Sequence, residues 1–170
     1  MSRPHPSRVI VRLVLLAGVV AAALVYLIAT SEALPGRVAA HFAIGGQADG
    51  WMDRGHYITD MAVVMVALPL GSTLLLAVLR LLPVDLINIP NRAYWLAPAQ
   101  RAGTYRVLLI LGADLGIAEA LMIAALHAMI LNAQDRTDIL SDWSWKIALA
   151  LVVMILVRLI WFVRSFRHLP

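Results

Sequence analysis

Residues 105–131, YRVLLILGADLGIAEALMIAALHAMIL, decide the fold of this chain. Beyond its first two residues the run is apolar, apart from Asp114, Glu119 and His127. A helix crosses a hydrocarbon core of about 30 Å with about 20 residues, because each residue advances it by about 1.5 Å. The run therefore predicts a transmembrane helix. Since it is longer than a crossing needs, we expect it to tilt or protrude.

Three further apolar runs cover residues 9–29, 58–79 and 145–163. Of the 170 residues, 62% are hydrophobic and only 14% are charged. A soluble domain must cover its surface with polar groups and does not need so much apolar sequence. We therefore predict an all-α integral membrane protein with four transmembrane helices in a single domain, residues 1–170. The first run is longer than a signal-peptide core, so we expect it to be an uncleaved anchor.

The basic residues gather on alternate sides of these runs, which predicts the orientation. Segments on the cytoplasmic side of membrane proteins are enriched in lysine and arginine. With both termini cytoplasmic, the outer side holds four basic residues, Arg37, Arg54, Arg136 and Lys146. The inner side holds ten: Arg3, Arg8, Arg12, Arg80, Arg92, Arg101, Arg106, Arg158, Arg164 and Arg167. We therefore predict an inner-membrane protein with an outer loop over residues 30–57 and an inner interfacial segment over residues 80–104.

The net charge and the absence of cysteine limit the classes of partner and of chemical site that the chain can have. The net charge is +4, but the arginines are scattered at the ends of the apolar runs. We therefore expect anionic lipid headgroups on the cytoplasmic side, and not nucleic acid, as the partner of this charge. The absence of cysteine excludes disulfides, thiolate metal sites and a cysteine nucleophile.

Small residues recur at every fourth position of the third run. Such a row makes a shallow groove in which another helix backbone can approach closely. The groove predicts a helix contact, either within the chain, with a protein partner or with a second copy. In the second run, Pro69 removes one backbone hydrogen bond and predicts a bend. The groove residues are Gly112, Gly116, Ala120, Ala124 and Ala128.

Four ionisable residues fall inside the predicted membrane spans. A charge at the bilayer centre costs about 2.5–3.5 kcal/mol on insertion scales, so these side chains should face protein or water. Depth along the helices places Asp114 of the third span near Arg158 of the fourth. We predict an ion pair between them, acting as a structural lock or as a functional group. Reversing both charges should then restore what a single reversal loses.

Glu119 and His127 lie on the half of the third span that does not carry Asp114. A helix with polar groups on two sides is best placed centrally, in contact with neighbours on both. Histidine changes charge near neutral pH, so together with a carboxylate it could relay protons. The alternative is that each residue is neutral and hydrogen-bonded to a neighbouring helix.

The outer loop contains glycines at positions 45, 46 and 50, which indicate turns, with Asp49–Gly50 as the strongest turn signal. His41 and His56 could gather around a divalent cation with Asp49, Asp53 and Asp60, but their spacing matches no compact ligand motif. The alternative is that these residues are simply solvated, and we predict no metal and no cofactor.

Several positions of this loop follow a known pattern. They are Pro35, His41, Phe42, Gly46, Asp49 and Trp51. The pattern resembles the bacterial membrane domain of unknown function at the N-terminus of SdpI-type immunity proteins. The segment 88–98, NIPNRAYWLAP, is similar to a motif in short members of that group. The resemblance covers about residues 10–100, and it implies a role in resistance to a peptide toxin. This chain has Ala39 and Ala40 before His41, where the family often has a proline, and it has only four spans.

Residues 81–100 combine three prolines with many apolar side chains. We expect this segment to lie along the inner membrane surface, with Tyr94 and Trp95 at headgroup level and Arg92 near phosphates. A docking surface for a partner protein is the alternative. Asn88 and Asn91 belong to the same interfacial motif.

The predicted function is non-enzymatic: a sensor, immunity-like or accessory protein that recognises a ligand or protein through His41, Phe42, Asp49 and Trp51. The first alternative is a small proton-coupled transporter or channel that uses Glu119 and His127. The second is a metal-dependent membrane enzyme. The sequence contains no HExxH motif, no Ser/His/Asp arrangement and no phosphate-binding glycine loop, so we do not expect an enzyme.

Overall fold

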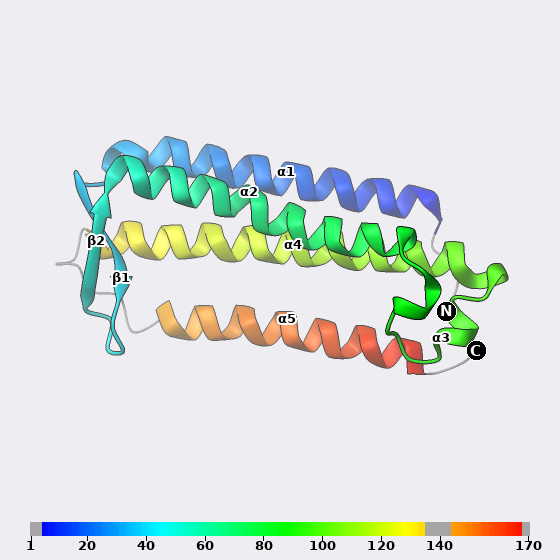
Figure 1. Ribbon diagram of the computed structural model, residues 1–170. Coiled ribbons are helices and arrows are strands. Elements are labelled where there is room, and N and C mark those ends of the chain that lie inside the picture. Colours follow the sequence, from blue (N-terminus) through cyan, green and yellow to red (C-terminus); the bar gives the residue numbers. More distant parts are fainter. Residues whose placement is uncertain (1–4, 135–143, 168–170) are drawn as a thin grey trace.

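The computed structural model describes residues 5–134 and 144–167 (Figure 1). Arg3 and Arg136, which enter the charge count above, lie outside these residues. Four long helices dominate the described part: α1 (Pro6–Thr30), α2 (Arg54–Val78), α4 (Pro98–Gln134) and α5 (Ser144–Arg167). Each is long and apolar enough to cross a membrane. The predicted fold of four membrane-spanning helices is confirmed, and the chain is a multi-pass membrane protein.

Helix α4 is longer than its apolar run. It has 37 residues and begins at Pro98, seven residues before the predicted span. Proline suits the start of a helix, where a missing N–H costs nothing. At about 1.5 Å per residue the helix is about 55 Å long, well beyond the thickness of the hydrocarbon core. Short 3-10 turns extend α1 through Ser31–Ala33 and α2 through Leu79–Leu81.

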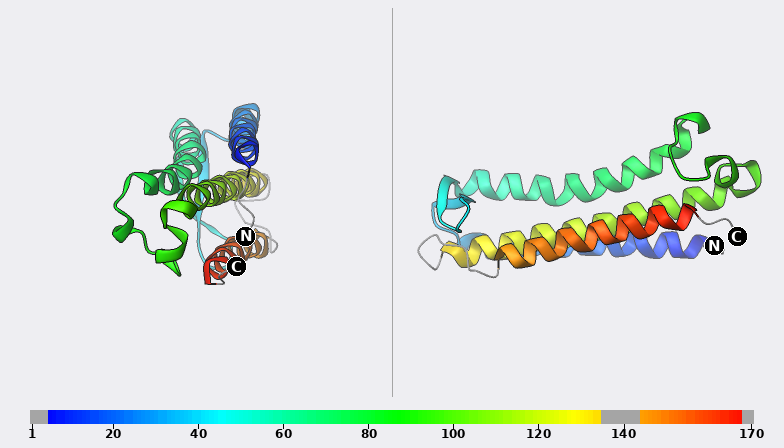
Figure 2. Two further views of the ribbon diagram at one scale, coloured as in Figure 1. Left: turned by 90° about the vertical axis from the view of Figure 1, so that its right-hand side faces the viewer. Right: turned by 90° about the horizontal axis from the view of Figure 1, so that it is seen from below.

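Helix α4 is the centre of the bundle and contacts α1, α2 and α5 (Figure 1). The first two small residues of its row, Gly112 and Gly116, lie against α2. A Cβ atom added at Gly112 would lie 3.0 Å from Thr73 Cα, and one added at Gly116 would lie 2.7 Å from the carbonyl oxygen of Pro69. The groove predicted from the sequence is therefore occupied by a helix of the same chain. Helix α2 continues through Pro69 and curves along its length (Figure 2).

The buried core lies between α1, α2 and α4. At one end Leu27, Tyr57, Met65 and Ile123 pack together, and nearer the middle Leu16 packs on small residues of α4. Helix α5 contributes to neither cluster. It contacts α4 along one side, and its apolar middle stays exposed on the bundle surface.

The outer loop folds into an antiparallel hairpin of β1 (Arg37–Phe42) and β2 (Ala48–Asp53). Arg37 pairs with Asp53, and the turn lies between the strands at Gly45 and Gly46, both with positive φ. The predicted turn at Asp49–Gly50 is wrong. Those two residues lie in β2, and the glycine is required because a Cβ there would meet His41 Cβ at 2.9 Å. We call this side of the molecule the hairpin end.

At the opposite end, a short 3-10 turn (Val84–Leu86) and the one-turn helix α3 (Arg92–Trp95) connect α2 to α4. We call this the α3 end. Trp95 is buried there, and its Nε1 donates a hydrogen bond to the carbonyl of Phe166 at 2.9 Å. Asn91 Nδ2 donates to the carbonyls of Phe166 and Arg167, both at 3.0 Å. The segment thus satisfies carbonyl groups at the C-terminal end of α5, which the helix itself leaves without partners.

The Trp95 ring packs edge-on against Phe166 of α5 and is buried, so it faces the chain's own fourth span, and its depth relative to the headgroups stays a prediction. Tyr94 is only half-buried, and Asn88 is exposed. Arg92 is held by Asp85, at 2.7 Å from its carbonyl oxygen and 3.6 Å from its carboxylate. The surface of this segment docks on the chain's own fourth span.

Candidate functional site

The hairpin is fixed to the ends of the first two membrane helices. Asp53 accepts a hydrogen bond from Gly55 N at 2.8 Å and so caps α2. The guanidinium of Arg54 donates to the carbonyl of Leu34 at 3.2 Å. Val38 is completely buried in the same apolar cluster as Tyr57. Strand β1 therefore rests on the bundle and cannot swing as a free loop.

A further residue, Gln134, fixes the hairpin to α4. Its side-chain amide accepts from Ala39 N at 3.0 Å and donates to Ala39 O at 3.1 Å. The side chain thereby satisfies both backbone groups of an edge position, as a neighbouring strand would. Sequence reasoning missed Gln134, because its only signal is a polar residue at the end of a long apolar run.

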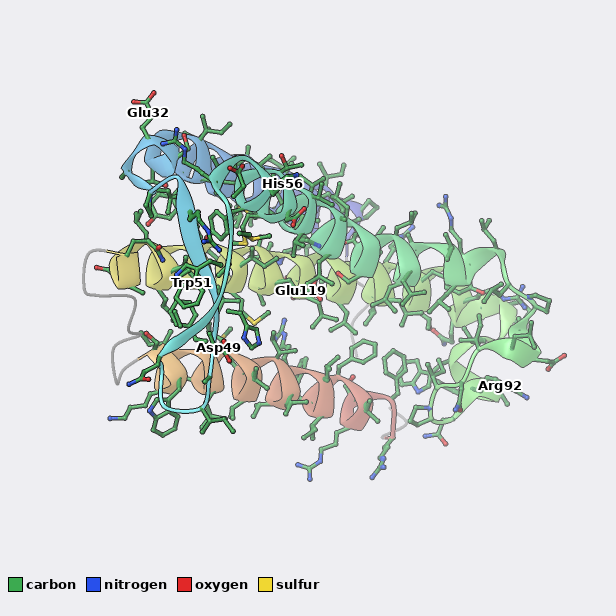
Figure 3. All side chains as sticks on the ribbon, turned by 60° about the vertical axis from the view of Figure 1, so that its left-hand side comes forward. Glu32, Asp49, Trp51, His56, Arg92 and Glu119 are labelled. Carbon is green, nitrogen blue, oxygen red and sulfur yellow. The ribbon has the colours of Figure 1, made fainter. Side chains whose placement is uncertain are left out.

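The outward face of the hairpin carries most of the predicted recognition residues. Asp49 and Trp51 alternate with inward residues along β2 and come forward in Figure 3. The ring of His41 in β1 pairs with the Asp49 carboxylate. The Trp51 side chain is 45% exposed, although a large aromatic ring is normally buried. Phe42 is half-buried opposite Ala48 and contributes less to this face.

The histidines and aspartates of this region form two separate pairs. His41 pairs with Asp49, and His56 lies 4.0 Å from Asp53. Within residues 5–134 and 144–167, no three His, Asp or Glu side chains come together as a metal site would need. The geometry therefore gives no support to the metal-dependent alternative.

Below the hairpin, His127 is completely buried and joins three helices. Its Nδ1 lies 2.8 Å from the hydroxyl of Tyr57, and its Nε2 lies 2.8 Å from that of Thr30. Thr30 donates its one hydroxyl hydrogen to the carbonyl of Tyr26, so its oxygen must accept from the imidazole. We therefore assign the ring hydrogen to Nε2, with Nδ1 accepting from Tyr57.

The structure does not bring Glu119 and His127 together. The two residues are eight positions apart on α4, about 12 Å along its axis. Glu119 instead accepts a hydrogen bond from Ser72 of α2 at 2.8 Å. Each residue is bonded to hydroxyls of neighbouring helices, which is the alternative to a direct relay.

We expect Tyr57→Phe to lower the free energy of unfolding by about 0.6 kcal/mol, the average for one hydrogen bond between membrane helices, and by no more than about 1.7 kcal/mol. The matched control is Tyr26→Phe. Its ring contacts His127 edge-on with centroids 5.3 Å apart, and its hydroxyl has no partner among the described residues. Unfolding titrations in mixed detergent micelles measure both variants. Equal loss in both would show that the Tyr57 hydroxyl contributes nothing specific.

Asp114 is held on two sides. Its Oδ2 lies 2.6 Å from Arg158 of α5, so the structure contains the predicted contact. Its Oδ1 lies 3.2 Å from Arg12 of α1, a partner that sequence reasoning did not identify. One carboxylate on the central helix therefore connects the first and the fourth span, which contact each other little.

Comparison with known families adds one match. Residues 18–66 are similar to the family described as Domain of unknown function (DUF1648). No curated protein and no solved structure matched the chain. The matched residues run from the middle of α1 through the hairpin to the middle of α2, and they include His41, Asp49, Trp51 and Tyr57. Over this part the chain is similar to a membrane domain of unknown function.

Proposed function

We propose that this protein is a non-enzymatic receptor of the bacterial inner membrane. It recognises a protein or peptide outside the cytoplasm through the outward face of the hairpin. One observation carries the proposal. Strand β1 is held in place by Gln134, while Trp51 on the neighbouring strand β2 is exposed beside the His41–Asp49 pair. An exposed aromatic side chain on a hairpin whose backbone is held in place is typical of a binding surface, because little backbone freedom is lost on binding.

The distribution of arginine supports this orientation. Nine of the described arginines lie on the α3-end side of the molecule: Arg8, Arg12, Arg80, Arg92, Arg101, Arg106, Arg158, Arg164 and Arg167. The hairpin end has Arg37, Arg54 and Lys146. Under the positive-inside rule this distribution favours an orientation with both termini in the cytoplasm and the hairpin outside.

The acidic side chains suggest the chemistry of the ligand. Asp49 and Asp53 flank Trp51 along β2, and Ile44 at the turn is fully exposed. Such a face suits a peptide segment with basic and apolar side chains, since opposite charges raise the rate and specificity of association. The resemblance to SdpI-type immunity proteins makes protection against a secreted peptide one form of this role.

The absence of cysteine provides a direct experiment. Ile44→Cys puts a single thiol at the hairpin turn, and Leu86→Cys puts one at an exposed position of the α3 end. We expect a membrane-impermeant maleimide to label the Ile44→Cys variant on intact cells and the Leu86→Cys variant only after lysis. A photoreactive maleimide on the hairpin thiol should then yield a discrete adduct with a protein or peptide.

A matched pair of variants, each made in the Ile44→Cys background, tests recognition itself. Alanine at His41, Phe42, Asp49 and Trp51 should abolish the adduct while leaving expression unchanged. Alanine at Glu32 and Asp60, which are exposed at the same end, should preserve it. Labelling of the Leu86→Cys variant on intact cells would overturn the orientation, and an adduct that survives the four alanines would overturn recognition by this face.

A further inference from the structure

A second surface of the molecule combines an apolar groove with arginines that no carboxylate of the described residues neutralises. Helices α1 and α2 diverge towards the α3 end, where α2 curves away (Figure 2). Between them, over α4, lies a groove of about 680 Å³. Its lining is apolar over most of its length, with Leu16, Leu74 and Leu109 among the residues from the three helices.

Arg80 and Arg106 line the same groove. Neither forms an ion pair or a side-chain hydrogen bond with another described residue. This distinguishes them from Arg92 and Arg101 at the same end, which bond to Asp85 and to the carbonyl of Leu96. The groove lining contains no acidic residue. Two positive charges thus remain uncompensated at an apolar surface, where an anion would be favoured.

The packing of α2 against α4 places both arginines at one level. Gly112 lies against Thr73, and Gly116 lies against Pro69, so the two helices run antiparallel. Seven residues from Thr73, along α2 and into the 3-10 turn Leu79–Leu81 that follows it, lead to Arg80. The same number back along α4 leads from Gly112 to Tyr105, the neighbour of Arg106. The guanidinium groups therefore lie at the α3 end of the groove, and the leucines lie one to three turns further towards the hairpin end.

We propose that this groove holds one anionic phospholipid. Its phosphate contacts Arg80 and Arg106, and an acyl chain lies between α1 and α2. Two cationic groups at one end of an apolar groove match an anionic head joined to a hydrocarbon tail. A soluble anion would contact the two arginines but would leave the apolar part of the groove unfilled. A zwitterionic lipid would add a positive choline group beside two arginines.

Native mass spectrometry of the full chain, titrated in mild detergent with phosphatidylglycerol, tests this site. We expect one phosphatidylglycerol molecule to be retained at least about tenfold more tightly than phosphatidylcholine. Arg80→Gln with Arg106→Gln should remove that preference. The matched control, Arg92→Gln with Arg101→Gln, removes the same charge at the same end but should leave the preference unchanged.

Two further measurements separate a seated lipid from charge attraction alone. Ala77→Phe fills the apolar part of the groove while leaving both arginines, and it should reduce retention as strongly as the double glutamine variant. Glycerol phosphate at millimolar concentration should not displace the lipid, because it lacks the chain. Equal retention of both lipids by the unchanged protein would overturn the proposal. An equal loss of the lipid preference in the two double glutamine variants would overturn it too, as would unchanged lipid retention by Ala77→Phe. Finding a second copy of the chain bound in the groove instead of a lipid would also overturn it.

Discussion

Replacing Asp114 with leucine should destabilise the protein by about 2–3 kcal/mol. The substitution leaves Arg12 and Arg158, 3.2 and 2.6 Å from the carboxylate, without that carboxylate as a partner inside the membrane spans. Removing one member of a buried ion pair typically costs about 3–5 kcal/mol, but both arginines are half-exposed and can reach towards the interface. Helix α5 should be affected most, because it has few other contacts with the bundle.

Thermal unfolding in detergent, together with protease accessibility of α5, measures this effect. Because Arg12 also contacts Asp114, exchanging the charges of Asp114 and Arg158 should not restore full stability. Reversing Asp114 and Arg158 together would set an arginine beside Arg12, so the simple charge swap should recover only part of the loss. Leucine at all three positions removes every charge and should restore stability, as hydrophobic replacement of buried ion pairs often does. If the triple variant is no more stable than Asp114→Leu, the destabilisation does not come from unpaired arginines.

Replacing Gly116 with alanine should cost about 2–3 kcal/mol, at the upper end for one added methyl group in a packed interior. The new Cβ would lie 2.7 Å from Pro69 O, 3.0 Å from Leu16 Cδ1 and 3.0 Å from Thr73 Oγ1. A backbone oxygen cannot turn aside, so α2 must move away from α4. The hydrogen bond between Thr73 and the carbonyl of Gly112, 3.1 Å long, would be strained by the same movement.

Two other glycines complete a graded series. At Gly112 the added atom would meet Thr73 Cα at 3.0 Å, so we expect a smaller loss. At Gly71, on α2 itself, no atom lies within 4 Å, and alanine should be neutral or slightly stabilising because it favours the helix. Unfolding titrations should rank stability as Gly71→Ala, then Gly112→Ala, then Gly116→Ala. Equal values for all three would show that α2 and α4 do not approach so closely.

The membrane spans were predictable because hydrocarbon requires a long apolar helix wherever the chain crosses it. The Asp114–Arg158 contact was predictable as well, since depth along two antiparallel helices follows from residue number. Arg12 was not, because its contact depends on how α1 is rotated about its own axis. Glu119 and His127 share the half of α4 away from Asp114, but only the packing of α1 and α2 decided that Ser72 bonds to Glu119 and that Tyr57 and Thr30 bond to His127.

The sequence by itself determined that four helices cross a membrane, that the third is central, and that its small residues accept a neighbouring backbone. Only the tertiary structure decided that α2 fills that groove, that Gln134 holds the hairpin, and that Trp95 caps α5. The physical reason is that apolar length and periodicity are properties of one segment. A hydrogen bond between segments depends on their relative rotation and height, which the packing of all four helices sets together.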